Sequence, residues 1–280
     1  MTTLTKLSVA TMSLLVFGLA CSKDSVPLTS PQTLSSQSVL TSNDDALLLM
    51  NFNNDLIDES KYHRPVSFVG TEEYRKGCDD NAIMFEGNEY AQVPASTSLQ
   101  PDNVTVEVWM SPKHALASDG SFYPLVVKYA GNFWNTVDGY DMWYQDSGGG
   151  GRVGFGIGTK GGTLRLHASL TTVLEPSKLY HIVGTYDGQY ARLYLNGDEV
   201  AATPYADGLA YLGAGIRIGG GVYHSYYGGY QYYRGLIDEV AIFPRALSAD
   251  EVRSRYHTCE LFVLNQSGSS DKDRDVPTEP

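Results

Sequence analysis

The sequence predicts an all-β protein, and three observations lead to this prediction. The 280 residues include 20 tyrosines and 29 glycines, a composition typical of an aromatic-rich fold with many turns. Residues 104–110 alternate cleanly, with three valines and a methionine on one face. Asp187-Gly188 and Asn196-Gly197 are strong hairpin turns, and an alternating segment, 191–195, lies between them.

The first 20 residues are expected to be a signal peptide, followed by a lipidated cysteine. Lys6 supplies the positive charge, and the apolar stretch 7–19 is too short to span a membrane. Ordinary cleavage after Ala20 is one interpretation of this end. The other, which we favour, is a lipobox similar to that of bacterial lipoproteins, in which Cys21 becomes the lipid-bearing first residue. The predicted location is then a bacterial outer membrane, on either of its sides, through a lipid anchor.

Composition divides the rest of the chain into three parts. Residues 21–43 are rich in Ser, Thr, Pro and Gln and are expected to form a flexible tether. Residues 44–264 hold the apolar and aromatic segments and form the predicted folded domain. Residues 265–280 are charged and contain Pro and Ser, so we expect a disordered tail.

Charge excludes some partners. The formal net charge is -12, which argues against nucleic acid and against anionic membrane surfaces as ligands. It says little about neutral glycans. Membrane contact is therefore expected through the lipid anchor only, and the folded domain is expected to be monomeric.

A further strand is predicted at 235–243, and it carries two adjacent acids, Asp238 and Glu239. Side chains alternate along a strand, so Asp238 shares a face with Val240 and Ile242, and Glu239 shares the other face with Phe243. Whichever face is the core, one carboxylate lies among apolar residues and needs a cation or several donors. Three roles remain open: acceptor of backbone N–H groups, calcium ligand, or catalytic acid.

One short helix is predicted after this strand. Ser248 stands three residues before Glu251, which makes a capping box for one short helix. Beyond this helix, the apolar residues 261–264 are expected to form one more short β segment.

Several of these segments together resemble laminin-G-like, concanavalin A-like jelly-roll domains of bacterial surface proteins. The resemblance implies a jelly-roll β-sandwich with one short C-terminal helix. It rests on motifs in the family's order: the strand 46–52 with its Asn/Asp-rich loop, Phe85-Glu86-Gly87 with 90–94, the strand 104–110, Tyr180 to Gly188, the strand 216–219, and Gly235 to Val240 with 246–252. Glu86 stands where the family usually has aspartate.

The resemblance also implies a disulfide and a structural calcium ion. The first and last strands of such domains are neighbours, which makes a bridge between Cys78 and Cys259 plausible; two unpaired thiols are the alternative. Related domains often hold one Ca²⁺, with ligands from the first strand region, the turn after the second strand and a carboxylate near the last strand. Mapped by motif, these are Asp238, Glu86, Gly87, Asn51 and Asn53.

No catalytic residues are predicted. A laminarinase-like glucanase places its carboxylates on one face of one strand, as in Glu-x-Asp-x-x-Glu, and no such string is present. Glu107, in a predicted strand, is expected to be structural or solvated, and His181, also in a predicted strand, is expected to do no metal or acid–base work.

The best binding candidate is a segment rich in tyrosine and glycine, 220–233. Tyrosine stacks on the apolar faces of sugar rings and is also a favoured anchor in protein interfaces. The alternative is that some of these rings cover the core edge or extend a hairpin. The predicted contact residues are Tyr223, Tyr226, Tyr227, Tyr230 and Tyr232, with Trp134 in a second, weaker patch.

The predicted function is a non-catalytic, lectin-like carbohydrate-binding module of a lipid-anchored bacterial surface protein. The alternative is a protein–protein adhesion or assembly module, whose partner would be a cell-surface protein. A glycan-degrading hydrolase is the third possibility.

Overall fold

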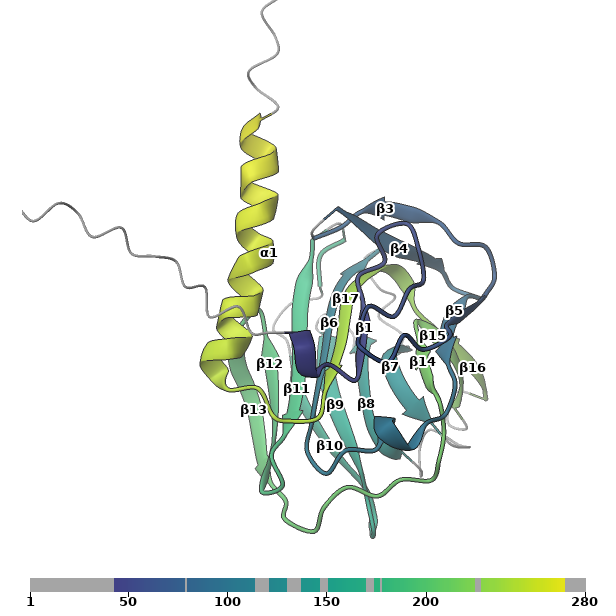
Figure 1. Ribbon diagram of the computed structural model, residues 1–280, viewed down its shortest axis with the longest axis vertical. Coiled ribbons are helices and arrows are strands. Elements are labelled where there is room, and N and C mark those ends of the chain that lie inside the picture. Colours follow the sequence, from purple (N-terminus) through teal and green to yellow (C-terminus); the bar gives the residue numbers. More distant parts are fainter. Residues whose placement is uncertain are drawn as a thin grey trace, which may run out of the picture. The chain divides into compact units, whose positions relative to one another are not determined.

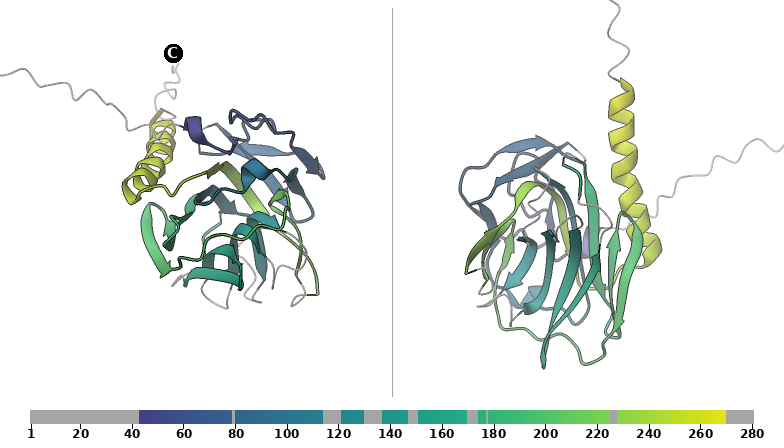
Figure 2. Two further views of the ribbon diagram at one scale, coloured as in Figure 1. Left: turned by 60° about the horizontal axis from the view of Figure 1, so that its bottom comes forward. Right: turned by 180° about the vertical axis from the view of Figure 1, so that it is seen from behind.

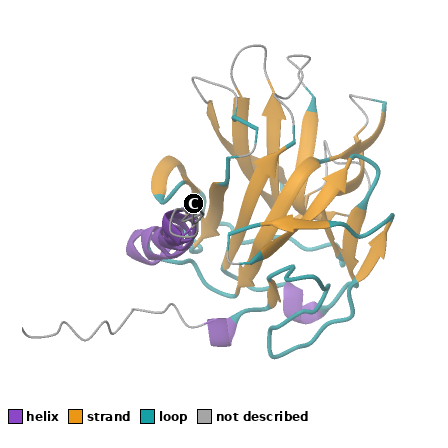
Figure 3. Ribbon diagram, turned by 90° about the horizontal axis from the view of Figure 1, so that it is seen from above, coloured by secondary structure: helices purple, strands orange, loops and turns teal. Residues whose placement is uncertain are grey.

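Two antiparallel sheets are stacked face to face, as the sequence predicted (Figures 1 and 3). The computed structural model describes residues 43–78, 80–113, 121–129, 137–146, 151–169, 174–176, 178–224 and 228–269. Within them the fold is a two-sheet β-sandwich with one C-terminal helix.

The first sheet has eight strands within the described residues. Its order is β13 (Asp198–Pro204), β12 (Tyr190–Leu195), β11 (Tyr180–Tyr186), β6 (Val104–Pro112), β17 (Arg234–Phe243), β4 (Asn81–Glu86) and β3 (Tyr74–Lys76). The eighth, β1 (Leu48–Met50), pairs with the second half of β17, where Leu48 lies opposite Ile242. The first and last strands of the domain are therefore neighbours.

The second sheet has seven described strands, and a separate hairpin accompanies it. The sheet order is β10 (Gly162–Ser169), β9 (Gly151–Thr159), β8 (Val137–Asp146), β7 (Phe122–Tyr129), β14 (Ile216–Ile218), β5 (Tyr90–Val93) and β2 (Ser67–Val69). The hairpin consists of β15 (Gly220–His224) and β16 (Gly229–Tyr232). Two short 3-10 turns, η1 (Asn43–Asp45) and η2 (Thr97–Leu99), complete the strand region.

The main core lies between the sheets, and alternation in the sequence builds it. Val153, Phe155 and Ile157 of β9 are fully buried in it, while the glycines between them face outward. A Cβ on Gly154 or Gly156 would come within 2.1 or 2.0 Å of a side chain of the neighbouring strand β8. These glycines therefore make room for Trp143 and Asp141, which are buried on the outer face.

Strand β17 contains a β-bulge that the sequence did not predict. Glu239 adopts a left-handed conformation, with φ 47°, and the register against β6 shifts between Asp238 and Ala241. One extra residue on β17 reverses the alternation beyond it. The prediction that Asp238 shares a face with Val240 and Ile242 is therefore wrong. These two join the main core, whereas Asp238 lies opposite Trp109 on the outer face of the sheet.

Helix α1 (Ala249–Ser269) covers part of that outer face, beside strands β12 and β13 (Figure 2). The predicted capping box is present: the N–H of Ser248 donates to Glu251, and the N–H of Glu251 donates to the Ser248 hydroxyl at 3.2 Å. The predicted β segment at 261–264 is wrong, because these residues continue the helix. A short apolar run has no period that separates strand from helix. No helix in the described part of the chain has the length and apolar character needed to cross a membrane.

The disulfide predicted between Cys78 and Cys259 is present and fastens α1 to the sheet. It joins the turn before β4 to the helix, with 5.3 Å between the two Cα atoms and a sequence separation of 181 residues. Both cysteines are buried beside Trp109.

Candidate functional site

The tyrosine-rich segment forms the hairpin β15–β16, and one of its faces is fixed to the second sheet. Val222 packs with Phe122 and Trp143, which lie on strands β7 and β8. His224 is buried as well, with its ring 5.4 Å from that of Phe122. Because Val222 and His224 point toward the sheet, the residues that alternate with them point away from it.

The outer face of the hairpin carries Tyr223, Tyr230 and Tyr232. Tyr223 and Tyr230 are directly opposite each other in the ladder, and their rings pack edge to face at 5.6 Å. Tyr230 is 61% exposed, Tyr223 is 42% exposed and Tyr232 is half-buried. Three of the predicted contact residues therefore share one accessible face, which we call the tyrosine face.

Two residues that the sequence did not single out, Tyr90 and Arg217, lie at the base of this hairpin. The guanidinium of Arg217 lies over the Tyr90 ring, 5.0 Å from its centre, and donates to the carbonyl of Gly221. A Cβ on Gly221 would come within 2.7 Å of Tyr90, so the glycine allows this ring to approach. Both residues lie on neighbouring strands, β5 and β14, and sequence alone does not give that order.

Four predicted residues lie outside the described part of the chain. They are Tyr226, Tyr227, Trp134 and Cys21.

The carboxylate of Asp238 serves backbone N–H groups. One of its oxygens accepts from Cys78 at 2.8 Å, and the other accepts from Glu239 at 3.0 Å. Asp238 is fully buried, and a Cβ on Gly77 would come within 2.3 Å of it. Of the three roles left open for the buried acid, the structure contains the first.

The other predicted calcium ligands form separate contacts. The Glu86 carboxylate accepts from Lys113 at 2.5 Å. The N–H groups of Glu86 and Gly87 both donate to Glu89. Two further contacts involve the asparagines: Asn51 donates to Glu59 at 2.8 Å, and the Asn53 side chain accepts from the Asn81 N–H at 3.0 Å.

These residues do not converge on one ion. Glu86 lies opposite Arg234, and Ile83 lies opposite Ile237, so Asp238 is displaced from Glu86 by four residues, about 13 Å along the strand. Within the described residues, no group of three or more His, Cys, Asp or Glu side chains is placed to hold a metal ion. The donor set therefore does not fit the calcium ion that the resemblance implies.

Calcium binding itself stays a prediction, and thermal unfolding checks it. Because the predicted ligands do not converge on one ion, we expect the melting temperature of the protein kept in Ca²⁺ to stay unchanged when EDTA is added. A fall of several degrees that excess Ca²⁺ reverses would contradict this expectation and support a calcium site formed by other oxygen atoms.

A buried ionic cluster lies under helix α1, where it serves the fold. Glu107 accepts from His181 at 2.8 Å and from the guanidinium of Arg255 at 2.6 Å. Burial alone would raise the pKa of Glu107, but the charge of Arg255 and the hydrogen bond from His181 hold it below its usual value. The rings of Trp109, His181 and Tyr256 pack together, with 4.7 Å between Trp109 and His181 and 5.7 Å between Trp109 and Tyr256. Glu107 and His181 are thus both buried in contacts that join helix α1 to the sheet.

Comparison with known protein families gives a match for most of the sandwich. The family model described as the concanavalin A-like lectin/glucanases superfamily, Laminin_G_3, matches residues 85–253. No curated protein gives a match.

Three solved structures illustrate the similarity. The binding domain of Paraclostridial Mosquitocidal Protein 1 is 16% identical with a TM-score of 0.60, over 76% of this chain and 52% of that one. Domain 4 of AbnA, a GH43 extracellular arabinanase from Geobacillus stearothermophilus solved with arabinotriose, is 18% identical with a TM-score of 0.52, over 75% and 97%. The ligand-binding domain of botulinum neurotoxin serotype D, solved with N-acetylneuraminic acid, is 16% identical with a TM-score of 0.57, over 78% and 52%.

The chain spans about half the length of the two toxin domains, and identities this low establish the fold alone. The family match, in contrast, covers more than half of the chain, and it includes strands from β4 to β17 and the start of α1. The protein therefore belongs to the Laminin_G_3 family of the concanavalin A-like lectin/glucanase superfamily.

Proposed function

We propose that this chain is a non-catalytic, lectin-like carbohydrate-binding module of a lipid-anchored bacterial surface protein. The observation that carries the proposal is the tyrosine face: aromatic rings exposed on a hairpin whose other face is buried against the sandwich. A sugar ring that stacks on such a surface replaces water on both partners. The rings are already fixed, so binding orders few additional side chains.

The chemistry of the tyrosine face suits a sugar. The edge-to-face pair leaves Tyr230 the more exposed ring, so its aromatic face can contact the C–H groups of a pyranose or furanose. Tyrosine O–H groups reach the sugar hydroxyls. Arg217, held over Tyr90 beside the hairpin, adds N–H donors.

Two of the similar structures support a sugar ligand by what their names record: arabinotriose for the arabinanase domain and N-acetylneuraminic acid for the neurotoxin domain. These ligands belong to those proteins. For the present chain they make oligosaccharides, neutral and acidic, the first ligands to test.

The positions of the acids support binding without hydrolysis. A glycosidase needs two carboxylates flanking the scissile bond. Glu107 is covered by α1 and paired with Arg255, and Asp238 is fully buried. Incubation of the purified protein with mixed plant, algal and host glycans, followed by a reducing-end assay, tests this part; release of reducing ends would contradict it.

Replacing Tyr230 by alanine tests the tyrosine face. We expect retention on a glycan array to fall about 30-fold, because truncating a central aromatic anchor costs about 2 kcal/mol or more. Tyr190→Ala is the matched control, since Tyr190 is also exposed, at 42%, but lies on β12 away from the hairpin. It should leave retention unchanged, and both variants should keep the melting temperature of the wild type.

Other outcomes of this experiment identify the alternatives. Equal retention by Tyr230→Ala and wild type would contradict the role of the tyrosine face. A blank array on folded protein, combined with a pulled-down protein partner that Tyr230→Ala loses, would favour the adhesion or assembly module.

The lipid anchor is tested at Cys21. We expect a palmitate analogue to label the wild-type protein in bacterial cells and to leave Cys21→Ala unlabelled, because the acyl chains require that cysteine. Cys259→Ala serves as a control for loss of a different cysteine and should be labelled. Equal labelling of wild type and Cys21→Ala would contradict lipidation at this position.

A further inference from the structure

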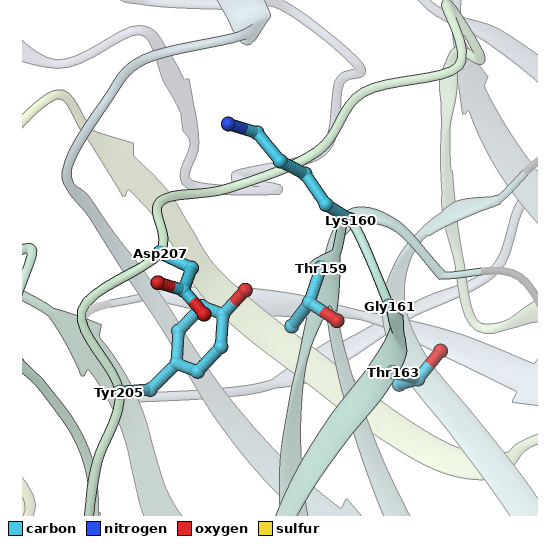
Figure 4. A pocket seen from close by; sticks show the side chains of 6 residues that line it. All are labelled: Thr159, Lys160, Gly161, Thr163, Tyr205 and Asp207. Atoms are coloured by element: carbon cyan, nitrogen blue, oxygen red, sulfur yellow. The ribbon is translucent and has the colours of Figure 1, made fainter.

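A second concave site lies at the end of the sandwich, outside the hairpin. It is a pocket of about 400 Å³ lined by Thr159, Lys160, Gly161, Thr163, Tyr205 and Asp207. Figure 4 shows its two walls: the turn between β9 and β10 forms one, and the segment that follows β13 forms the other, with Tyr205 and Asp207 on it. The pocket therefore lies where the edges of the two sheets meet.

Hydrogen bonds on both walls hold this pocket open before any ligand arrives. The N–H of Tyr205 donates to the carbonyl of Gln189 at 2.7 Å, which ties one wall to the first sheet. The N–H of Ala210 donates to the carbonyl of Gly158 at 2.9 Å, which ties the same segment to β9. The Tyr205 ring rests against Tyr186, with 6.1 Å between ring centres. A preformed cavity loses little conformational entropy when it is filled.

The lining has the composition of a polyol site. Thr159 and Thr163 supply hydroxyl groups that both donate and accept. The carboxylate of Asp207 is exposed, and its two oxygens can accept from two neighbouring hydroxyls of one ligand. Tyr205, half-buried, offers an aromatic surface to an apolar ring face. Such a combination suits a sugar ring, which has vicinal hydroxyls around its edge and C–H groups on its faces.

We infer that this pocket is a second carbohydrate-binding site, which takes one or two sugar residues through their vicinal hydroxyls. Its volume lies at the lower end of the roughly 300–1,000 Å³ typical of small-molecule sites, which excludes a long oligosaccharide from lying wholly within it. The site shares no residue with the tyrosine face. One polysaccharide that reaches both sites would bind more tightly than either site alone allows, because the second contact is intramolecular.

The open space at one glycine of the pocket allows a variant that blocks the pocket. A Cβ on Gly161 would meet nothing within 4 Å, and this residue does not need a left-handed backbone. Gly161→Phe therefore places a large side chain in the open space of the pocket without a clash in the fold. Gly229→Phe is the matched control, because Gly229 has equally open surroundings and an equally permissive backbone but lies on β16. Asp207→Asn removes the charge and keeps the size of the side chain.

The test is saturation-transfer NMR on the full chain with D-galactose, D-glucose, L-arabinose and N-acetylneuraminic acid, each alone at millimolar concentration. We expect wild type to saturate at least one of these sugars. Gly161→Phe should remove the part of that signal that arises in the pocket, and Asp207→Asn should weaken the affinity of the pocket about tenfold or more, through the loss of charge-assisted hydrogen bonds. Gly229→Phe should retain the signal, Tyr230→Ala is measured beside it to separate the two sites, and melting temperatures confirm that all variants are folded.

Two results would overturn the inference. One is a folded wild type that saturates none of the four sugars. The other is a signal that both Gly161→Phe and Asp207→Asn leave undiminished. If Tyr230→Ala removes such a surviving signal, the sugar is held by the tyrosine face, and the proposed function stands while the second site fails. If the pocket variants lose the signal and Tyr230→Ala leaves array retention unchanged, the pocket stands and the tyrosine face fails.

Discussion

Replacing Cys259 by serine is expected to lower the free energy of unfolding by about 5 kcal/mol. The disulfide closes a loop with a sequence separation of 181 residues, and the loss of that constraint enlarges the unfolded ensemble. Folded domains are stable by only about 5–15 kcal/mol, so this one bond contributes a large part of the total. Contacts of α1 with Trp109 and Glu107 remain in the variant and keep the helix near the sheet.

Equilibrium unfolding in guanidinium chloride measures this effect. Cys78→Ser and the double variant should have the same stability as Cys259→Ser, because each lacks the same bond. A reductant should lower the stability of the wild type to that level and leave the double variant unchanged, which is the internal control. A loss below about 1 kcal/mol in all three variants would show that the chain-entropy account of this bond is wrong.

Lys128→Met is expected to lower the free energy of unfolding by about 3–5 kcal/mol, because it leaves a buried carboxylate without its cation. The Lys128 ammonium donates to Asp138 at 3.0 Å and to the carbonyl of Ala214 at 2.6 Å, and both charged side chains have no exposed surface. Burial lowers the pKa of Lys128, and the Asp138 charge opposes that shift. Asp138 also accepts from the N–H groups of Leu212 and Ala214, so the variant loosens the segment between β13 and β14.

The control for Lys128→Met is Lys113→Met. Lys113 also binds a carboxylate, Glu86, but the two side chains are 34% and 42% exposed, and exposed pairs contribute about 0–1 kcal/mol. Urea unfolding of both variants should separate them by at least about 2 kcal/mol. Equal losses would contradict the importance of burial. Adding Asp138→Leu to Lys128→Met should restore only part of the stability, because Leu212 and Ala214 then lack their acceptor.

The sequence predicted those elements whose structure depends on residues close together in the chain. Alternation placed 104–110 in a strand with Glu107 and Trp109 on one face, and the Ser248–Glu251 spacing placed the start of α1. The bulge at Glu239 has no such signal, because a glutamate in a left-handed conformation is held there by its neighbours in space. The error at Asp238 followed from that one extra residue.

The candidate sites also contain some residues that the sequence pointed out and others that only the fold brings together. Composition alone drew attention to Tyr223 and Tyr230, since tyrosines between glycines are unusual for a core strand. Tyr90 and Arg217 join the base of the hairpin only because β5 and β14 are neighbours. The pocket lies between the turn that joins β9 to β10 and the segment that follows β13, and the hydrogen bond between Ala210 and Gly158 holds these two together. Neither juxtaposition follows from a local pattern, because each depends on the order of strands in a sheet.

The covalent ring closed by Cys78 and Cys259 also determines how this domain carries mechanical load. Consider tension applied between the chain that precedes Asn43 and a ligand held on the hairpin β15–β16. Residues 43–77 lie between this point and the ring, and they extend by at most about 120 Å when they are pulled out of the fold. From the disulfide, two arcs of chain lead to the hairpin, and the one through α1 and β17 is much the shorter. If the strands are pulled apart, we expect that arc to become taut first, so that strand β17 bears the force before the longer arc, which contains the pocket.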